Sequence, residues 1–474
     1  MNVFRHGLLL ALTSTLLAPA AFAQKREASG LYAQFCASCH GAKLQGGTSP
    51  SMLDDVWRYG GDDATLTRII REGTAEAGMP AFGGAFSDAE IRALVVFIRE
   101  QRIDYQRSRT SVAQPSSDAV IKSEQHTFTL ETVADGLREP WSLAWLPDGR
   151  MLITEKPGTL RIVENGKLLS APVAGTPEVN SGGQGGLLEV ATHPDYAKNG
   201  WIYLAFSHPA KNAQGENVSM TKLVRGKIRD GAWTDEEAIW TAPLETYRRA
   251  GGVHYGCRIA FDGKGYLYFS HGERGTQEHA QDIKRPNGKI HRIHDDGRIP
   301  ADNPFVNEPG AIGSIWTFGN RNPQGLDFDP RTGVLWETEH GPRGGDELNI
   351  VSKGLNYGWP VITYGMNYNG TPITGETARA GMEQPVIHWT PSIAVCGIDF
   401  YEGGAFPKWT GNLFVTALAQ QELRRVVIEN NQVTHQEVML KDIARLRDVA
   451  SGPDGLLYVV MNGPDRIVRL VPVK

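Results

Sequence analysis

The sequence predicts an all-β, six-bladed β-propeller that is preceded by a small all-α domain. Three observations lead to this prediction. The chain has 474 residues, which is enough for one small and one large domain. Residues 24–106 carry apolar residues at helical spacing. The region from residue 126 onward repeats a unit of strand, Asp/Pro/Gly turn and strand six times.

The composition agrees with a folded, turn-rich protein. The chain has 54 glycines and 27 prolines, which favour turns, and its 41% hydrophobic residues are enough to build a core. The formal net charge of -5 gives no basic surface. We therefore expect no nucleic-acid partner and no binding to an anionic membrane.

Residues 1–23 have the pattern of a signal peptide. Arg5 and His6 precede an apolar segment, and residues 21–23 (Ala-Phe-Ala) give the small-x-small pattern that signal peptidase cleaves. A membrane anchor is the alternative, but the apolar segment is shorter than the ~20 residues that a spanning helix needs. We expect cleavage after Ala23 and a mature protein, with no membrane span, in a bacterial periplasm.

A helix is predicted near each end of residues 24–106. The second helix should begin at a capping box, because the side chains of Ser87 and Glu90 can each satisfy a backbone N–H of the other residue. The apolar stripe that follows at helical spacing consists of Ile91, Leu94, Val95 and Ile98. Residues 107–125 are polar, contain Ser and Pro and lack periodicity, so they predict a linker.

Six repeats in residues 126–474 predict the blades. The copies lie at residues 143–153, 188–204, 259–269, 326–336, 398–415 and 449–460. Each copy would supply neighbouring strands of one blade, with further strands and insertions between copies. The strand near residues 128–130 is expected to complete the last blade and close the ring. A β-sandwich is the alternative, but a sandwich would not need the repeat.

The helical domain carries a haem attachment motif. Cys36, Cys39 and His40 form Cys-x-x-Cys-His, in which the two thiols bond covalently to haem c and the histidine binds the iron. A zinc half-site or a redox dithiol is the alternative. Zinc would need a second Cys/His pair, and none follows in this domain.

A methionine is expected on the other side of the haem iron. Met79 lies in a Gly-Met-Pro-Ala-Phe loop before the second helix, and a thioether ligand raises the haem potential. Met52 is the competing ligand, and a packing role for Met79 is the remaining alternative. Residues 28–103 resemble a class I cytochrome c, which implies a role in electron transfer.

Polar clusters stand out in the propeller region. Residues 321–325 form a polar loop, and residues 340–347 form a tight, oxygen-rich loop that suits a hard cation such as calcium. The single residues of interest are His254, Glu273, Arg445 and Arg447. Arginines near a cation imply an anionic cofactor, and loops on one rim of a propeller converge at its axis. Taken singly, each cluster also fits an ordinary surface loop.

Together these motifs resemble the soluble PQQ-dependent aldose sugar dehydrogenases of the glucose type. The matching segments are 183–188 (Gly-Gln-Gly-Gly-Leu-Leu), 321–325 (Arg-Asn-Pro-Gln-Gly), 341–342 with 346–347 (Gly-Pro and Asp-Glu), 356–360 (Asn-Tyr-Gly-Trp-Pro) and 445–448 (Arg-Leu-Arg-Asp). The resemblance implies a six-bladed propeller that holds pyrroloquinoline quinone (PQQ) on a calcium ion over its axis.

The resemblance also implies catalytic roles. His254 would be the general base that takes the proton from the anomeric hydroxyl of the sugar. Glu273 would orient the imidazole, although the glucose enzymes have the shorter Asp there. Hydride would move from the sugar carbon to PQQ, and Arg321 would stabilise negative charge on the quinone oxygen.

The cofactor ligands are implied in the same way. The PQQ-binding residues would be Gln184, Asn322, Arg445 and Arg447. Main-chain oxygens of Gly341 and Pro342 would hold the catalytic calcium. Glu347 and the Tyr357 carbonyl resemble a second, structural calcium site, with Asp346 as a further neighbour.

One departure concerns a lysine that contacts PQQ in the glucose enzymes. The corresponding residues 417–421 are Ala-Leu-Ala-Gln-Gln, which favours a broad range of aldoses.

We expect oxidation of an aldose to its aldonolactone, with electrons passed to the fused haem and then to another cytochrome or an oxidase. The alternatives are a quinoprotein dehydrogenase for a non-aldose alcohol or aldehyde, and a non-enzymatic carbohydrate-binding propeller. Cys257 and Cys396 would form a disulfide or remain free thiols.

Overall fold

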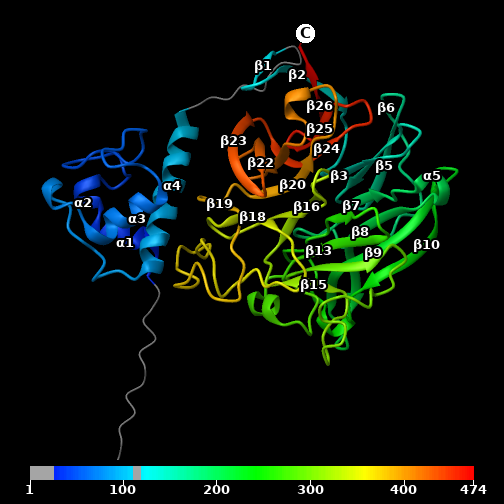
Figure 1. Ribbon diagram of the computed structural model, residues 1–474, viewed down its shortest axis with the longest axis horizontal. Coiled ribbons are helices and arrows are strands. Elements are labelled where there is room, and N and C mark those ends of the chain that lie inside the picture. Colours follow the sequence, from blue (N-terminus) through cyan, green and yellow to red (C-terminus); the bar gives the residue numbers. More distant parts are fainter. Residues whose placement is uncertain (1–25, 110–118, 474) are drawn as a thin grey trace, which may run out of the picture.

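The computed structural model describes residues 26–109 and 119–473 in two bodies (Figure 1). A small helical body lies beside a large propeller, and the long helix α4 stands between them. The predicted signal peptide, residues 1–23, lies outside the described residues. In the described part of the chain, no helix is long and apolar enough to cross a membrane.

The helical body is built as the sequence predicts. Its helices are α1 (Ala28–Phe35), α2 (Ala37–His40), α3 (Asp63–Glu72), the short 3₁₀ helix η1 (Ala75–Ala77) and α4 (Asp88–Arg109). The capping box is confirmed, since the backbone N–H of Ser87 donates to Glu90 Oε2 at 2.9 Å and that of Glu90 to Ser87 Oγ at 3.3 Å. The apolar stripe of α4 is buried in the core of this body.

The predicted linker at residues 107–125 is shorter than expected at both ends. Helix α4 continues to Arg109, and β1 (Ile121–Lys122) lies inside the predicted linker. The helix persists because Arg107 pairs with Asp442 at 3.0 Å and donates to the Ala419 carbonyl at 3.0 Å, both on the propeller. These contacts join residues far apart in sequence, so the local composition could not show them.

Six sheets form the propeller, and the predicted blade number is confirmed. The first blade contains β3 (Pro140–Trp145), β4 (Met151–Glu155), β5 (Thr159–Glu164) and β6 (Lys167–Leu168). The second contains β7 (Leu187–Thr192), β8 (Ile202–Lys211), β9 (Asn217–Arg229), β10 (Ala232–Thr241) and β11 (Arg248–Arg249). The third contains β12 (Ile259–Phe261), β13 (Tyr266–His271), β14 (Lys289–His294) and β15 (Ile315–Phe318).

The remaining blades complete the ring. The fourth contains β16 (Pro323–Phe328), β17 (Leu335–Glu339), β18 (Asp346–Ile350) and β19 (Ile387–Trp389). The fifth contains β20 (Val395–Phe400), β21 (Leu413–Ala417), β22 (Glu422–Glu429) and β23 (Gln432–Lys441). The sixth contains β24 (Arg445–Ser451), β25 (Leu457–Asn462) and β26 (Arg466–Pro472), joined by β2 (Thr127–Ala134) and β1. Short helices α5 (Tyr196–Asn199), η2 (Leu244–Thr246), η3 (Gln277–Gln281) and η4 (Pro407–Trp409) lie in the connections.

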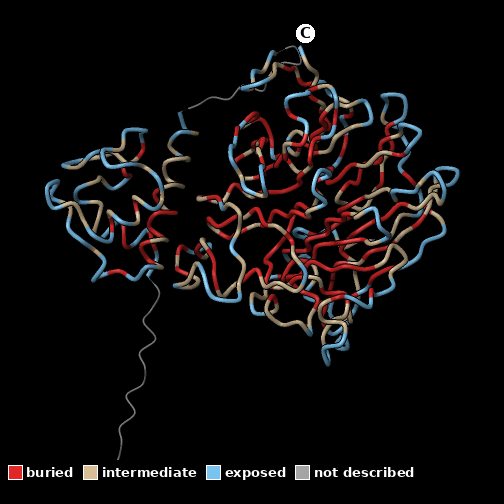
Figure 2. Tube along the Cα trace, in the orientation of Figure 1, coloured by how far each residue is buried: buried red, intermediate tan, exposed pale blue. Residues whose placement is uncertain are grey.

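The first strand of each blade contacts the first strand of the next, and β24 contacts β3, so the ring is closed. The predicted closing strand is confirmed, because β2 pairs with β26 through Phe128 opposite Pro472 and Leu130 opposite Leu470. Each repeat copy supplies the first two strands of a blade. Apolar side chains pack between neighbouring sheets, and Figure 2 shows buried strand centres with exposed outer hairpins. This arrangement leaves the loops at the propeller axis free to carry polar groups.

Cys257 lies just before β12 of blade three, and Cys396 lies in β20 of blade five. Both residues are buried, and both are free thiols. Of the two alternatives that the sequence left open, the structure has free thiols.

Candidate active site

A cavity of about 520 Å³ lies where the loops of several blades meet. Its volume falls within the range of roughly 300–1,000 Å³ that is typical of small-molecule sites. The predicted cofactor-binding residues that line it are Gln184, Asn322, Arg445 and Arg447. They come from three separate parts of the chain, so the structure brings together residues that the sequence identified one motif at a time.

His254 and Glu273 form a buried pair beside this cavity. The two atoms His254 Nδ1 and Glu273 Oε1 are 2.7 Å apart, and the residues are 7% and 1% exposed. The His254 backbone N–H donates to Gln184 Oε1 at 2.8 Å, and the next residue, Tyr255, lines the cavity. The carboxylate accepts the Nδ1 proton, so Nε2 keeps the lone pair that a general base needs.

The backbone at this pair is constrained. His254 has a φ of 58°, in the left-handed region that a residue with a Cβ adopts only when its surroundings hold it there. A Cβ at Gly272 would collide with the His254 carbonyl oxygen. Glycine at 272 therefore lets the end of β13 pass directly beneath His254, and the next residue is the carboxylate that orients it.

The charges around the pair favour a neutral imidazole and an ionised carboxylate. Burial and the Arg321 charge lower the pKa of His254 below its usual 6.5, although Glu273 acts in the opposite direction. Burial opposes the charge on Glu273, but the hydrogen bond from His254 and the nearby Arg321 guanidinium outweigh it and lower the pKa of Glu273. At neutral pH, His254 can therefore accept a proton.

Arg321 is held at the inner end of blade four. Its backbone N–H donates to Glu339 Oε2 at 2.7 Å, and its Nη1 donates to the carbonyls of His340 and Gly341 at 2.9 and 3.0 Å. The guanidinium lies 5.2 Å from the ring of Trp359. These contacts fix a buried positive charge close to the His254 and Glu273 pair.

The cavity and its surroundings offer donors that suit an anionic cofactor. Arg447 Nη1 donates to Gln324 Oε1 at 3.3 Å, and Arg445 Nη1 donates to the Leu418 carbonyl at 3.5 Å. The buried donors Arg321 Nε and Arg447 Nε have no hydrogen-bond partner within the described residues. A buried donor without a partner is costly, so these groups fit a ligand that brings acceptor oxygens, as the carboxylates and carbonyls of PQQ would.

Arg258, which the sequence analysis did not identify, supports two residues that line the cavity, Gln324 and Arg447. Arg258 is buried, donates through Nε to the Gln324 carbonyl at 2.6 Å and through Nη2 to the Arg447 carbonyl at 3.1 Å. Salt bridges at 2.8 Å to Glu189 and Asp448 compensate its charge. Arg258 thus connects blades two, three, four and six next to Arg447, which is predicted to bind PQQ.

The 340–347 loop is shaped by Asp346. Its carboxylate accepts from the Gly341 N–H at 2.8 Å, from Ser392 Oγ at 2.8 Å and from the Val395 N–H at 3.2 Å. These hydrogen bonds fix the backbone at Gly341, whose carbonyl is predicted to hold calcium together with that of Pro342. The Gly341 carbonyl already accepts from Arg321, and its second lone pair is what a cation would use.

Three glutamates gather behind this loop. Glu339 and Glu347 are direct partners across strands β17 and β18, and Glu337 lies two residues away on β17. Burial raises the pKa of Glu347 to about 7 and that of Glu337 to about 8, with like charges adding to the effect. Across the described chain, no three or more His, Cys, Asp or Glu side chains are arranged to hold a metal ion by themselves. A calcium ion at Glu347 would therefore depend on main-chain oxygens such as that of Tyr357, and the unpartnered Glu337 Oε2 fits such an ion.

The haem motif lies at a cavity inside the helical body. Cys36, Cys39 and His40 line it together with Leu94 and Ile98 of α4. His40 Nδ1 donates to the Pro50 carbonyl at 3.3 Å, which leaves Nε2 for the iron. These residues fit a covalently attached haem.

Both candidate methionine ligands line the same cavity and an adjoining one. Met79 is held by a reciprocal pair of backbone hydrogen bonds with Thr74, at 3.0 and 3.1 Å, whereas the Met52 N–H donates to the Leu44 carbonyl at 2.9 Å. The geometry leaves both as candidates.

Several cavity residues carried no signal in the sequence. Trp141 follows Pro140 at the start of β3 and lies 5.8 Å from the Arg447 guanidinium. Leu418 lines the cavity where the glucose enzymes have a lysine, but Lys156, from the β4–β5 turn, also lines it. Lys156 Nζ is 3.0 Å from Glu139 Oε1. The cavity therefore has a lysine from a different blade.

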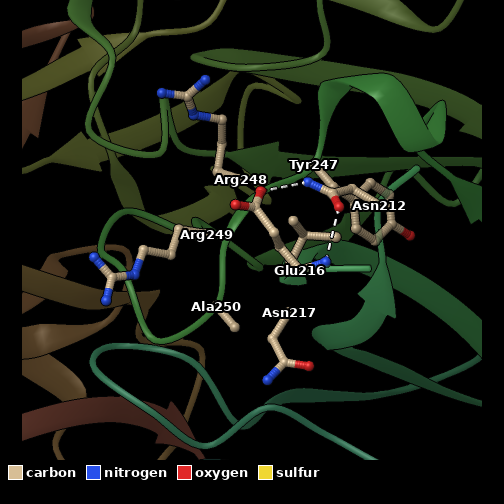
Figure 3. A pocket seen from close by; sticks show the side chains of 8 residues that line it. Asn212, Glu216, Asn217, Tyr247, Arg248, Arg249 and Ala250 are labelled. Carbon is tan, nitrogen blue, oxygen red and sulfur yellow. Dashed lines mark hydrogen bonds between the residues drawn. The ribbon is translucent and has the colours of Figure 1, made fainter. Parts of the chain in front are cut away.

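A separate hollow lies on the second blade (Figure 3). Its lining includes Arg248 and Arg249, and the side chains of Asn212 and Glu216 are hydrogen-bonded to each other at 2.8 Å. None of the predicted site residues is among the described residues that line it. The hollow borders the segment that leads to His254, but it is not the site that the motifs form.

Comparisons with known proteins agree with this geometry. The family model described as Glucose / Sorbosone dehydrogenase matches residues 137–469. The chain belongs to the glucose/sorbosone dehydrogenase family. Its propeller is therefore an oxidoreductase domain. The model described as Cytochrome C oxidase, cbb3-type, subunit III matches residues 23–98, so this dehydrogenase carries an N-terminal cytochrome c domain.

Relatives of this dehydrogenase match its propeller over nearly their whole length. Aldose sugar dehydrogenase YliI of Escherichia coli (strain K12) is 43% identical over 341 residues, which are 70% of this chain and 90% of that protein. The structure of the soluble aldose sugar dehydrogenase of Escherichia coli in its apo-form has 40% identity and a TM-score of 0.69, and covers 73% of this chain and 100% of that chain. The PQQ-bound form of aldose sugar dehydrogenase from Streptomyces coelicolor has 28% identity and a TM-score of 0.58, and covers 76% and 100%. The resemblance inferred from the motifs is confirmed.

Proposed function

We propose that this dehydrogenase oxidises aldose sugars to aldonolactones with PQQ and calcium, and that the electrons leave through haem c of its cytochrome domain. The observation that carries the proposal is the buried His254 and Glu273 pair next to a cavity rich in cationic donors. The PQQ-bound relative and the haem motif support the choice of cofactors. A further cytochrome or an oxidase would receive the electrons.

The chain's own residues would act as follows. His254 Nε2 takes the proton of the anomeric hydroxyl, while Glu273 fixes the ring through Nδ1 and offsets the charge that forms. PQQ, when bound, supplies an acceptor for the hydride from the sugar carbon, and haem, when bound, accepts single electrons. Arg321, Arg445 and Arg447 hold the anionic cofactor, and the Gly341 and Pro342 carbonyls hold calcium.

A reduction assay tests the proposal. Haem-loaded protein is incubated with calcium and PQQ and given D-glucose or another aldose, and the reduced α-band of the haem is followed without dye. Reduction that requires both PQQ and sugar supports the full proposal. Reduction of an added dye alone would mean that the propeller is the enzyme but the cytochrome has another partner. No reduction with any sugar would contradict the aldose assignment.

A second candidate is a dehydrogenase for a non-aldose aldehyde or alcohol, since the matched family model names sorbosone beside glucose. A panel of aldoses, sorbosone and simple alcohols separates the two candidates. A carbohydrate-binding propeller without activity is disfavoured by the buried base.

The protein is further proposed to be exported to a periplasm after cleavage behind Ala23. Mass spectrometry of the mature protein from its host is expected to find Gln24 as the first residue. An intact residue 1 would contradict this proposal.

The pH dependence of kcat/KM for sugar should reflect the protonation of His254. Because burial and Arg321 lower the pKa of His254 below 6.5, the neutral base persists at mildly acidic pH. The kcat/KM for sugar is expected to stay level through neutral pH and to fall about tenfold per pH unit once the pH is below the lowered pKa. Steady-state rates between pH 4.5 and 8 with a soluble dye check this, and a limb above pH 7 would contradict it.

Lys156 should contribute to PQQ binding. Replacing it by alanine removes a charged donor from the cavity and is expected to weaken PQQ binding about tenfold, in the range of one charge-assisted hydrogen bond. Titration of apo-protein with PQQ measures the Kd. Lys198→Ala is the matched control, because Lys198 pairs with Asp195 outside the cavity. Equal Kd values for both variants would exclude Lys156 as a cofactor contact.

The haem ligand should be Met79. A Met79→Ala variant is expected to have a lower haem reduction potential than the parent, because the thioether ligand raises it. Met52→Ala is the control and should leave the potential unchanged. The reverse pattern in a redox titration would assign the ligand to Met52.

A further inference from the structure

The connection between β18 and β19 lies against the cytochrome domain. In Figure 1 its yellow loops lie beside α4. Part of this connection, residues 364–375, reaches the active-site cavity on its other side, because Tyr368 lines the cavity and its ring lies 6.0 Å from the Arg321 guanidinium. We refer to residues 364–375 as the 364–375 loop. One short segment thus touches both domains.

Hydrogen bonds from the cytochrome domain hold the backbone of this loop and its border. The N–H of Ala28, the first residue of α1, donates to the Gly370 carbonyl at 3.0 Å. Arg92 of α4 donates through Nη1 to the Thr374 carbonyl at 3.3 Å and through Nη2 to the Gly375 carbonyl at 3.1 Å. Both residues bind main-chain oxygens, so they constrain the path of the loop itself.

An ion pair and apolar contacts complete the interface. Glu100 of α4 forms a two-pronged pair with Arg343, whose Nε lies 3.0 Å from Glu100 Oε1, and Arg343 Nη1 donates to the Tyr368 carbonyl at 3.3 Å. Met366 is 1% exposed and packs with Val96. A Cβ at Gly344 would lie 3.2 Å from Val96 Cγ2, so the Gly344 backbone lies close to the Val96 side chain.

The propeller holds this loop mainly near its beginning, where the Tyr364 ring stacks on His388 of β19 with 3.7 Å between the ring centroids. Residues 351–386 contain no strand or helix, and a connection of this length without regular structure is usually functional. On the propeller side, Met366 and Arg343 form two backbone hydrogen bonds with each other. Inside the loop, the Asn367 N–H donates to the Thr371 carbonyl, and the Gly370 N–H donates to the Asn367 carbonyl. Segments with few anchoring contacts open locally at low free-energy cost. The contacts from α1 and α4 therefore add anchors at Gly370, Thr374 and Gly375, beyond the residues that the propeller itself holds.

We infer that the cytochrome domain is a structural part of the sugar pocket, in which Glu100 and Arg92 act as positioning residues that hold Tyr368 at the cavity. This role rests on the proposed function but goes beyond it, because it does not involve electron transfer. Tyr368 is 69% exposed at the cavity, so its ring is available to a sugar that enters. An aromatic ring can cover the apolar face of a sugar, and its position then affects KM more than kcat.

Hydrogen exchange of the full-length apo-protein tests the anchoring directly. In Glu100→Arg and Arg92→Ala variants, peptides from residues 364–375 are expected to exchange about tenfold faster than in the parent. Arg71→Ala is the matched control, since Arg71 is an arginine of the same domain whose side-chain hydrogen bond goes to the exposed Asp88 and not to the propeller. Unchanged exchange of the loop in both interface variants would overturn the inference. If Glu100→Arg unfolds, the Arg92→Ala variant still tests the inference. A double variant with Glu100→Arg and Arg343→Glu restores the ion pair with the charges exchanged, and it is expected to restore slow exchange of the loop.

Kinetics with a soluble dye test the consequence for the pocket, because the dye makes the haem unnecessary. The interface variants are expected to raise KM for sugar about threefold to tenfold while kcat changes less than about twofold. Tyr368→Ala should raise KM similarly, and adding Glu100→Arg to it should raise KM no further, since coupled residues are not additive. Additive effects would overturn the link through Tyr368. If the parent oxidises no sugar, the proposed function fails, whereas the exchange experiment still decides the anchoring.

Discussion

Replacing His254 by alanine is expected to lower kcat/KM for sugar about 100- to 10,000-fold, which is the usual contribution of a positioned general base. The variant removes the Nε2 acceptor, and Glu273 is left buried with no imidazole to orient. Because His254 has a φ of 58°, alanine also strains the backbone. A His254→Asn variant separates the two effects, since asparagine tolerates left-handed backbone but is not a base. Dye-coupled kinetics of both variants make the measurement.

The control for this prediction is His193→Ala. His193 also pairs with a carboxylate, Asp295 Oδ2 at 3.0 Å, but it lies in the connection after β7 and does not line the cavity. Its loss should leave kcat/KM within about twofold, and the Kd for PQQ should stay similar in every variant. A His254→Asn enzyme that retains parental kcat/KM would show that another group takes the proton.

The fold was largely predictable because the inner strands carry a local pattern. Each repeat pairs two buried apolar strands across an Asp, Pro or Gly turn, and that signal needs no tertiary contact. The outer strands were harder to predict from the sequence. In β10, for example, buried and exposed residues do not alternate regularly along Ala232–Thr241. The length of α4 was missed because Arg107 stabilises its last turn through Asp442, which is distant in sequence.

The site was predictable where its residues lie in motifs, and hidden where only the ring brings residues together. Gln184, His254 and Asn322 belong to short polar segments, and their convergence follows from the closed propeller. Tyr368 and Lys156 have no such signal, because each reaches the cavity from a turn or loop whose neighbours in sequence are unrelated to the site. Buried supports such as Arg258 were missed for the same reason.

Arg321 is expected to be the second residue whose loss is severe. An Arg321→Ala variant should lower kcat/KM about 100- to 1,000-fold, the range measured when a preorganised electrostatic group is removed. The variant loses the donor to the His340 and Gly341 carbonyls and the charge that faces the cofactor site. An unfolding scan of the variant is needed alongside, because Glu339 then loses a nearby positive charge.

The pH profile distinguishes the electrostatic role from a structural one. The charges that face His254 are Glu273, Arg274 and Arg321, with His340 close by. The Arg321 charge lowers the pKa of His254, so its removal should raise that pKa and move the acid limb of kcat/KM to higher pH. Arg321→Lys keeps the charge and should keep the limb in place, although the compact ammonium cannot reproduce the two carbonyl contacts and some rate is lost. If the limb stays fixed in Arg321→Ala while the rate falls, Arg321 acts by holding the 340–347 loop and not through its charge.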